Sequence, residues 1–412
     1  MTETTQHSTR TPGRTSPAGV IAVLTLATLA TVTVELAPSG LLPHMSTDLG
    51  VPLGAVGLLV TVWALTIALG SIPLVRATSR IPRRTLLSAA LTVTAVANAA
   101  TALAPNFPVA FLGRLVAAGA HGLFWALVVT FVASLVRPEK LGTALSIVLA
   151  GPAFAGLVAL PAATAAAGAV GWRPTLLALS VLLLAIATAV WVVVGGPEGS
   201  SDAPERPGRW DHSARQVLTV AVGGSLVIAA HFAVFTYIAP IVVDLGGFAP
   251  SSIAAILLVF GVANAVGVVG AGVVSDRYPH AAAPAAAALL ALGVLILRLG
   301  GNVTPVFAIG VVLWGIATGA FPPILQARVL RVSTVAFRPL AGGVVITAMN
   351  LGIAAGALIG ATLLSSGAGT VVIAGFIAAS SGVAVLLFTG SRRDSSTSGG
   401  SATEDPAADL PA

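Results

Sequence analysis

The chain alternates between long apolar runs and short polar or charged breaks, and twelve of the runs are long enough to cross a membrane. A helix that spans a bilayer needs about 20 mostly apolar residues. The predicted spans of the first half are residues 18–42, 54–75, 85–104, 108–136, 141–168 and 174–195. Those of the second half are residues 216–243, 250–274, 281–298, 304–327, 340–365 and 369–390. We therefore expect an all-α integral membrane protein.

The breaks between the runs divide the chain into five regions. Residues 196–214 are polar and rich in Pro and Gly, which is typical of a flexible linker. Residues 1–17 and 391–412 are Ser- and Thr-rich tails, and we expect them to be disordered. The remaining regions, 18–195 and 215–390, are predicted to be the N-terminal and C-terminal six-helix bundles. The first apolar run is too long for a signal-peptide core, so we expect no cleavage.

The two halves also resemble each other. An offset of 197 residues aligns Gly70 with Gly267, Arg80 with Arg277, Pro82 with Pro279, Gly113 with Gly310, and Gly122 with Gly319. One offset that holds across several helices and loops indicates a duplicated unit and hence two pseudo-symmetric bundles. Transporters built from such repeats bind substrate near the middle of the membrane, between the repeats.

Composition and charge agree with a membrane protein and exclude several other classes. Charged residues make up 8% of the chain, against about 25% in soluble domains. With both termini in the cytoplasm, 17 of the 20 Lys and Arg residues lie on the cytoplasmic side, as the positive-inside rule predicts for an inner-membrane protein. The net charge of +6 therefore reflects topology and not nucleic-acid binding. Cysteine is absent, so disulfides and thiolate metal sites are excluded.

Glu35 is the only carboxylate inside a predicted span. A charge at that depth costs roughly 2.5–3.5 kcal/mol, which makes it a candidate proton site. Arg114 lies at a similar depth, on the order of 10 Å from the outer end of its own span, so a buried pair is expected. His121 follows Arg114 by two helical turns and could relay a proton. The alternatives are a structural clamp for the first two residues and, favoured for His121, a hydrogen-bonded packing histidine.

Four residues of the second half are candidates for the substrate cavity, which we also expect to include His121. His231 lies one position from the equivalent of Glu35, so it is expected to line the same cavity from the other side. Phe235 and Tyr237 offer aromatic surface to a substrate, and Asn350 is an amide within an apolar run. Ordinary packing is the alternative for the aromatic residues. For Asn350 it is an interhelical hydrogen bond.

Motifs for other chemistries are missing from the sequence. It contains no phosphate-binding GxxxxGK[ST] loop, no metal-ligand cluster and no nucleophile elbow. We therefore expect no enzyme activity, no cofactor, no metal and no use of ATP. Energy for transport must then come from an ion gradient or from the gradient of the substrate.

Several stretches match one known pattern. Residues 34–51 read VELAPSGLLPHMSTDLGV, residues 113–122 read GRLVAAGAHG, residues 235–240 read FTYIAP and residues 272–278 read GVVSDRY. Over about residues 18–390 the chain resembles the major facilitator superfamily, in particular its twelve-helix drug:proton antiporters. The nearest likeness is to bacterial exporters of chloramphenicol, sugars and purine nucleosides. This resemblance implies that Glu35 and Arg114 serve proton coupling.

The cytoplasmic loops depart from that pattern in the first half. The family's loop between helices two and three usually carries an Asp-Arg-x-Gly-Arg-Arg run. Here Ser79 replaces the aspartate and Pro82 the glycine, while the equivalent loop of the second half keeps its aspartate. The resemblance assigns gating to Arg80, Arg83, Arg84, Asp276 and Arg277. Cytoplasmic gating is thus expected to depend more on the second half.

The sequence favours one function and leaves two others open. The leading hypothesis is a monomeric secondary transporter that exports a small drug or metabolite in exchange for protons. A sugar or nucleoside exporter of the same fold is the first alternative. A membrane sensor or scaffold that transports nothing is the second, although the chain has no large soluble domain to support it.

Overall fold

A computed structural model describes residues 17–137, 140–194 and 211–391. Within these ranges the chain forms helices joined by short connections, and no strand occurs in them. The predicted tails and most of the predicted linker lie outside the described residues. The described part contains twelve helical segments that are long and apolar enough to cross a membrane, which confirms the expected fold class.

The first half contains seven α-helices that make six spans. They are α1 (Pro17–Leu49), α2 (Leu53–Ala77), α3 (Arg83–Ala102), α4 (Phe107–Leu135), α5 (Leu141–Phe154), α6 (Leu160–Val170) and α7 (Trp172–Val193). A π-helical turn, η2 (Ala155–Ala159), joins α5 and α6 into one span.

The second half repeats the arrangement. It consists of α8 (Ala214–Thr236), α9 (Ile238–Pro240), η3 (Ile241–Leu245), η4 (Pro250–Ser252), α10 (Ile253–Arg277), α11 (Ala282–Gly300), α12 (Thr304–Val332), α13 (Arg338–Leu363), η5 (Leu364–Ser366) and α14 (Ala368–Ser391). The predicted span 216–243 is interrupted, because α8 ends at Thr236 and Tyr237 leaves the helical conformation.

Local sequence signals account for several helix ends. The side chain of Asn106 accepts a hydrogen bond from the backbone N–H of Val109 (3.1 Å), and Pro108 follows in the first turn of α4, where its missing N–H costs nothing. Gly171 separates α6 from α7 with a φ of 91°, a conformation that glycine adopts without strain.

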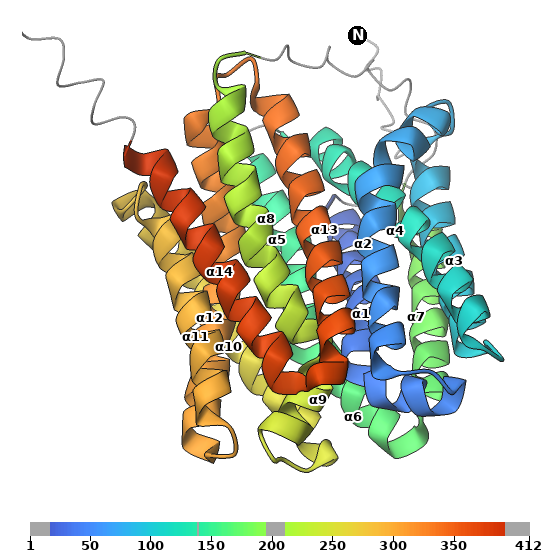
Figure 1. Cartoon of the computed structure of the whole chain (residues 1–412). Helices are drawn as coiled ribbons and strands as arrows, with labels where there is room; N and C mark the ends of the chain where they lie inside the picture. The colour runs from blue at the N-terminus through green and yellow to red at the C-terminus, as the bar shows by residue number, and fades with distance from the viewer. Residues whose placement is uncertain (1–16, 138–139, 195–210, 392–412) are drawn as a thin grey trace, which may run out of the picture.

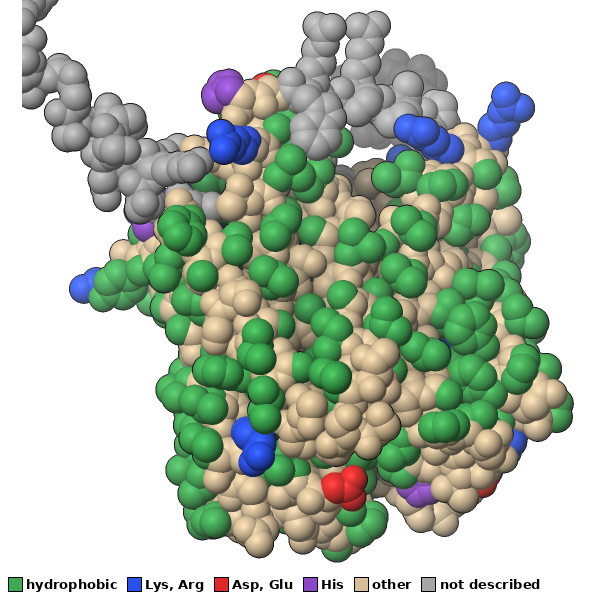
Figure 2. Space-filling model, viewed as in Figure 1, with side chains coloured by type: hydrophobic (Ala, Val, Ile, Leu, Met, Phe, Trp, Pro, Cys, Tyr) green, Lys and Arg blue, Asp and Glu red, His purple; other side chains and the backbone are tan. Residues whose placement is uncertain are grey.

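The surface is suited to a lipid environment. Many large apolar side chains on the spans are exposed, among them Leu69, Val269 and Phe388. On the face shown in Figure 2, most charged side chains lie near the upper and lower ends, and the band between them is apolar or uncharged. This arrangement places the hydrocarbon of the bilayer around the middle of the helices.

The two ends of the bundle differ in how the halves meet. We call the end where α1 begins, α8 begins and α14 ends the termini face (upper end in Figure 1), and the other end the opposite face. Near the opposite face α2 packs on α13 so closely that a Cβ atom on Gly54 would lie 2.7 Å from the carbonyl oxygen of Ala361. Toward the termini face, Gly342 and Gly343 of α13 have no such neighbour within 4 Å.

The buried apolar residues show the same asymmetry. One cluster joins the second half to those residues of the first half that lie near the opposite face, such as Leu42, Met45 and Val56. A separate cluster contains only first-half residues, among them Leu24, Leu87 and Val128. The halves therefore share a hydrophobic core near the opposite face and have separate cores toward the termini face.

Candidate functional site: an ionisable group and an aromatic cavity

Glu35 contacts His121 inside the first half. The Nε2 atom of His121 on α4 lies 3.3 Å from Oε2 of Glu35 on α1. The histidine side chain is 2% exposed and the glutamate side chain 20%, so the carboxylate is the accessible member of the pair. The ring of His121 packs against Trp63 and Trp125, with centroid distances of 5.0 and 6.2 Å. Its Nδ1 atom is buried and has no hydrogen-bond partner among the described residues. His121 therefore combines ring packing with a polar contact to the carboxylate, an arrangement open to both the relay and the packing interpretations.

Arg114 binds the backbone of α1. Its guanidinium donates to the carbonyl oxygens of Val34 and Glu35, both at 2.9 Å, and lies 4.0 Å from the ring centroid of Trp63. Proline has no N–H, so Pro38 leaves the Val34 carbonyl, four residues earlier, without its usual helical partner. Such a carbonyl must be satisfied within a membrane protein, and Arg114 supplies the hydrogen bond.

The expected pairing of charges is therefore different in the structure. Among the described residues, the Glu35 carboxylate makes its close contact with the His121 imidazole, while Arg114 donates to the two carbonyls and interacts with Glu35 electrostatically. The clamp between helices that the sequence left open as the alternative describes these Arg114 contacts.

His231 lies in an aromatic cluster at the centre of the second half. The centroid of its ring lies 4.7 Å from that of Phe232, 5.1 Å from Phe235, 5.5 Å from Trp314 and 5.9 Å from Phe260. The Phe260 ring is nearly parallel to it, with an angle of 6° between the planes. The side chain is buried, and its Nδ1 atom has no hydrogen-bond partner within the described chain.

A cavity of about 130 Å³ lies beside this cluster, between the two halves. The first half contributes Leu36, Pro152, Gly156 and Leu160, and the second half contributes His231, Phe232, Phe235, Leu257, Phe260, Gly261, Asn264 and Thr318. The predicted cavity residues His231 and Phe235 therefore lie together, and Leu36 brings the cavity next to Glu35 in sequence. Phe260 was missed by the sequence analysis, although the offset of 197 residues pairs it with Trp63.

Tyr237 and Asn350 lie elsewhere than expected. Tyr237 is wedged between α2 and α13, against Gly57 and Gly360, and its hydroxyl donates to the carbonyl oxygen of Ala357 (2.8 Å). The amide of Asn350 donates to the carbonyl oxygen of Ile346 in its own helix (3.0 Å). Neither residue lines the cavity beside His231. Tyr237 is the residue at which α8 ends, and its ring packs toward α2 and α13.

The loops at the termini face also differ between the halves. In the second half Arg331 at the end of α12 lies 3.2 Å from Oδ1 of Asp276 and also donates to the hydroxyl of Ser275 (3.2 Å). Arg277 donates to the Tyr278 hydroxyl. Arg331 was not assigned to gating from the sequence, and it joins the end of α12 to the last turn of α10.

The first half has no such carboxylate contact in its described loop. Ser79, at the position of the aspartate, donates its hydroxyl hydrogen bond to the carbonyl oxygen of Arg76 (2.9 Å). Arg84 lies over the ring of Trp191, 4.2 Å from its centroid. Arg80 is exposed and Arg83 is half-buried.

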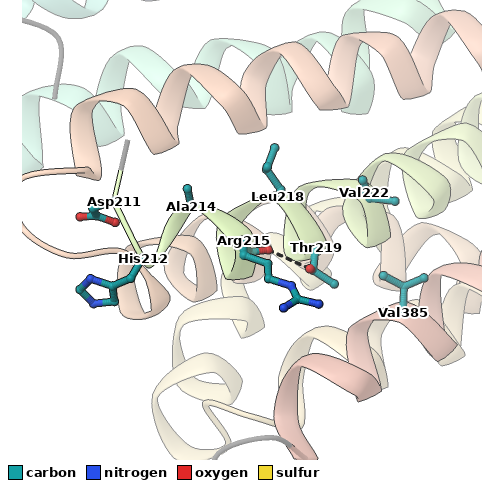
Figure 3. Close-up of a pocket in the computed structure, with 8 residues that line it drawn as sticks. All are labelled: Asp211, His212, Ala214, Arg215, Leu218, Thr219, Val222 and Val385. Atoms are coloured by element: carbon teal, nitrogen blue, oxygen red, sulfur yellow. Dashed lines mark hydrogen bonds between the residues drawn. The ribbon is translucent and has the colours of Figure 1, made fainter. Parts of the chain in front are cut away.

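A larger hollow, of about 650 Å³, lies on the surface at the start of α8 (Figure 3). Its lining includes His212, Arg215, Leu218 and Val385. Hydrogen bonds from Ser213 and Thr334 to the carboxylate of Asp211, also in the lining, hold the pKa of that group below its usual value. This hollow is separate from Glu35 and from the aromatic cavity, and it does not involve the first half.

Most of this chain aligns with transport proteins of known type. It is 31% identical over 361 residues to a chloramphenicol efflux pump of Mycobacterium tuberculosis, covering 85% of this chain and 87% of that protein. It is 34% identical over 341 residues to a chloramphenicol resistance protein of Streptomyces lividans, covering 81% and 86%.

The fold is also found among solved transporter structures. A bacterial homologue of the human lysosomal transporter Spinster, in an inward-facing and unoccupied conformation, superposes with a TM-score of 0.71 at 15% identity, covering 91% of this chain and 95% of that one. The sequence profile of the Major Facilitator Superfamily matches residues 24–246 and 220–410. The chain, a multi-pass membrane protein with efflux pumps among its relatives, belongs to the Major Facilitator Superfamily of transporters.

Proposed function

We propose that this transporter exports a small organic molecule, a drug or a metabolite, in exchange for protons. Its termini face is then the cytoplasmic side of a bacterial inner membrane. The basic residues that the topology places at that face support the orientation: Arg76, Arg80, Arg83, Arg84, Arg137, Lys140, Arg215, Arg277, Arg328, Arg331 and Arg338. Arg173 and Arg298 lie at the other end, an asymmetry that follows the positive-inside rule.

Alternating access accounts for the unequal contacts between the halves. With the termini face in the cytoplasm, the described conformation is closed to the outside, where α2 and α13 pack together, and its halves have separate apolar cores toward the inside. A rocking motion of the two bundles would open the outer seam and close the inner one. The substrate would then pass through the region between the halves where the aromatic cavity lies.

The contact between Glu35 and His121 is the observation that carries the proton coupling. One accessible carboxylate touches one buried imidazole, so a proton can be held by either group. Protonation of Glu35 removes its negative charge and weakens its attraction to a protonated His121. A bound proton shifts the conformational equilibrium only if one conformation binds it more tightly. Arg114 serves this step by fixing the backbone of α1 at Glu35.

The chain supplies a complete transport unit under this proposal. The cavity is formed by two halves of a single chain, which supports a monomer as the working form. The sequence contains no ATP-binding loop, which supports an ion gradient as the energy source.

The test is proton movement in proteoliposomes that contain a pH-sensitive dye, with chloramphenicol as the probe because relatives export it. Addition of chloramphenicol to the wild type is expected to release protons. Glu35→Gln should abolish the release while leaving the protein folded, because glutamine keeps the size of the side chain and cannot ionise.

Asp244→Asn is the matched control. It removes the charge of an exposed carboxylate at the other end of the molecule and should release protons as the wild type does. Unchanged proton release by Glu35→Gln would exclude Glu35 as the coupling group.

A further inference from the structure

The aromatic cavity occupies the second-half counterpart of the ionisable site. The offset of 197 residues pairs Glu35 with Phe232, Trp63 with Phe260, and His121 with Thr318. All three second-half residues line the cavity. The duplicated position has therefore kept its place between the halves, while its ionisable and indole side chains are replaced by phenyl rings and a hydroxyl.

The volume of the cavity limits what it can hold. Drug-sized molecules occupy pockets of about 300–1,000 Å³. An apolar cavity of about 150 Å³ in another protein holds one benzene molecule. At about 130 Å³, the cavity described here is suited to one aromatic ring, and the rest of a larger substrate must extend beyond it.

The walls determine the chemistry of that ring. None of the residues that line the cavity carries an acidic or permanently charged side chain. Burial of an unpaired charge is costly, so the imidazole of His231, which aromatic rings surround, is neutral. For the same reason, binding of a cationic ligand in the cavity is unfavourable.

Polar groups are nevertheless present at the wall. His231 is 6% exposed and its Nδ1 atom has no partner in the described structure. Asn264, also in the lining, is half-buried and adds a second polar group to the wall. A buried polar atom without a partner is unfavourable, and a ligand that supplies the missing hydrogen bond relieves this cost.

We propose that this cavity is a subsite for one uncharged aromatic ring of the substrate, and that His231 selects rings bearing a polar substituent by hydrogen bonding to it. The proposal rests on the transport function proposed above and names the substrate class of the same path. It assigns the organic substrate to the second half of the duplicated site.

The shape of the cavity is tested by filling it. Gly156 lines the cavity, and a Cβ atom on it would have no neighbour within 4 Å, so Gly156→Leu extends into open space without a clash at Cβ. Binding of radiolabelled chloramphenicol to the detergent-solubilised protein should weaken by about thirtyfold or more, the value expected for losing the burial of a ring.

Gly168→Leu is the control for Gly156→Leu. Gly168 is exposed on the same span, equally free of neighbours and outside the cavity, so binding should equal that of the wild type. Equal dissociation constants for the two leucine variants would overturn the proposal. Absence of any chloramphenicol binding by the wild type would overturn it as well.

The role of His231 is tested by exchanging the imidazole. His231→Phe keeps an aromatic ring but removes the nitrogen atoms, and should weaken chloramphenicol binding about tenfold. His231→Gln retains hydrogen-bonding groups and should recover part of that loss. Equal binding by His231→Phe and the wild type would remove His231 from ligand selection.

The preference for an uncharged ring is tested by competition between two small probes. Benzyl alcohol should displace chloramphenicol, and benzyltrimethylammonium should not. Displacement by the cation would contradict an uncharged subsite. These binding measurements need no proton gradient, so they are independent of the Glu35→Gln result. Failure of either experiment leaves the other conclusion standing.

Discussion

The two halves share one fold but differ in the chemistry of equivalent positions. The first half has a half-buried glutamate, a buried arginine and a buried histidine where the second half has Phe232, Val311 and Thr318. In the first half the buried cation satisfies backbone carbonyls and the carboxylate contacts a histidine. In the second half aromatic rings enclose a small cavity. On the functions proposed here, one copy of the duplicated site handles the proton and the other handles the organic substrate.

The largest expected effect comes from removing the cation of the first half. Arg114→Met leaves the carbonyl of Val34 without a donor, at a cost of about 1–3 kcal/mol, and also removes the hydrogen bond to Glu35 and the contact with Trp63. We expect a large fall in yield and in thermal stability in detergent. Val311→Ala, at the equivalent position, removes only two methyl groups, so its yield and thermal stability should fall far less. Similar losses for both variants would remove the distinction between the halves.

The seam between the halves gives the next effect. Gly57→Leu places a side chain where the Tyr237 ring lies, so the seam at the opposite face cannot close. The chain has no cysteine, so a single cysteine introduced at Ala361 reports access without background. Labelling from outside by an impermeant maleimide should rise several-fold. Gly70→Leu, on the same helix but without neighbours from other helices, should label as the wild type does.

A smaller effect should separate His121 from its counterpart. His121→Asn removes the titratable partner of Glu35 and should shift the pH dependence of chloramphenicol-driven proton release. Thr318→Val, at the equivalent position, should change substrate affinity and leave the pH profile unchanged. The two profiles, recorded between pH 5 and 8 in proteoliposomes, compare the halves directly. Identical pH profiles for His121→Asn and the wild type would exclude the imidazole from the coupling step.

The smallest effect concerns the loops. Asp276→Asn breaks an ion pair whose aspartate is largely exposed, and exposed pairs contribute at most about 1 kcal/mol. We expect little change in thermal stability and a reduction of about twofold in transport rate. Ser79→Asp, which supplies the first half with the missing carboxylate, should alter the rate without affecting substrate affinity. A large fall in stability of Asp276→Asn would show that the loop has a structural role.

The sequence was sufficient for the fold and insufficient for the contacts. Apolar runs determine the spans, because each must cover the width of the bilayer. They also locate Glu35 and Arg114 at a common depth, but depth does not determine how each helix is rotated about its axis. Arg114 binds the Val34 carbonyl because Pro38 leaves that carbonyl without its helical donor. The proline that causes this can be read directly from the sequence.

Other contacts required the structure. The end of α8 at Thr236, just before Tyr237, is not revealed by the continuous apolar run. The aromatic cavity combines residues of α8, α10 and α12 with the first half, and long-range packing of this kind leaves no local pattern. The repeat does provide one such signal, because it relates Phe260 to Trp63.

The hydrogen bonds from Arg114 to α1 also have a consequence for how the protein is made. The carbonyl of Val34, which Pro38 leaves without its helical partner, receives its hydrogen bond from a residue 80 positions later in the chain. During synthesis α1 therefore enters the membrane with an uncompensated carboxylate and a backbone carbonyl that lacks a donor. Both remain so until α4 has been inserted beside it. The first helix is thus synthesised first but acquires its stabilising contacts only after α4 has been inserted. Cellular quality control can act on it in that interval.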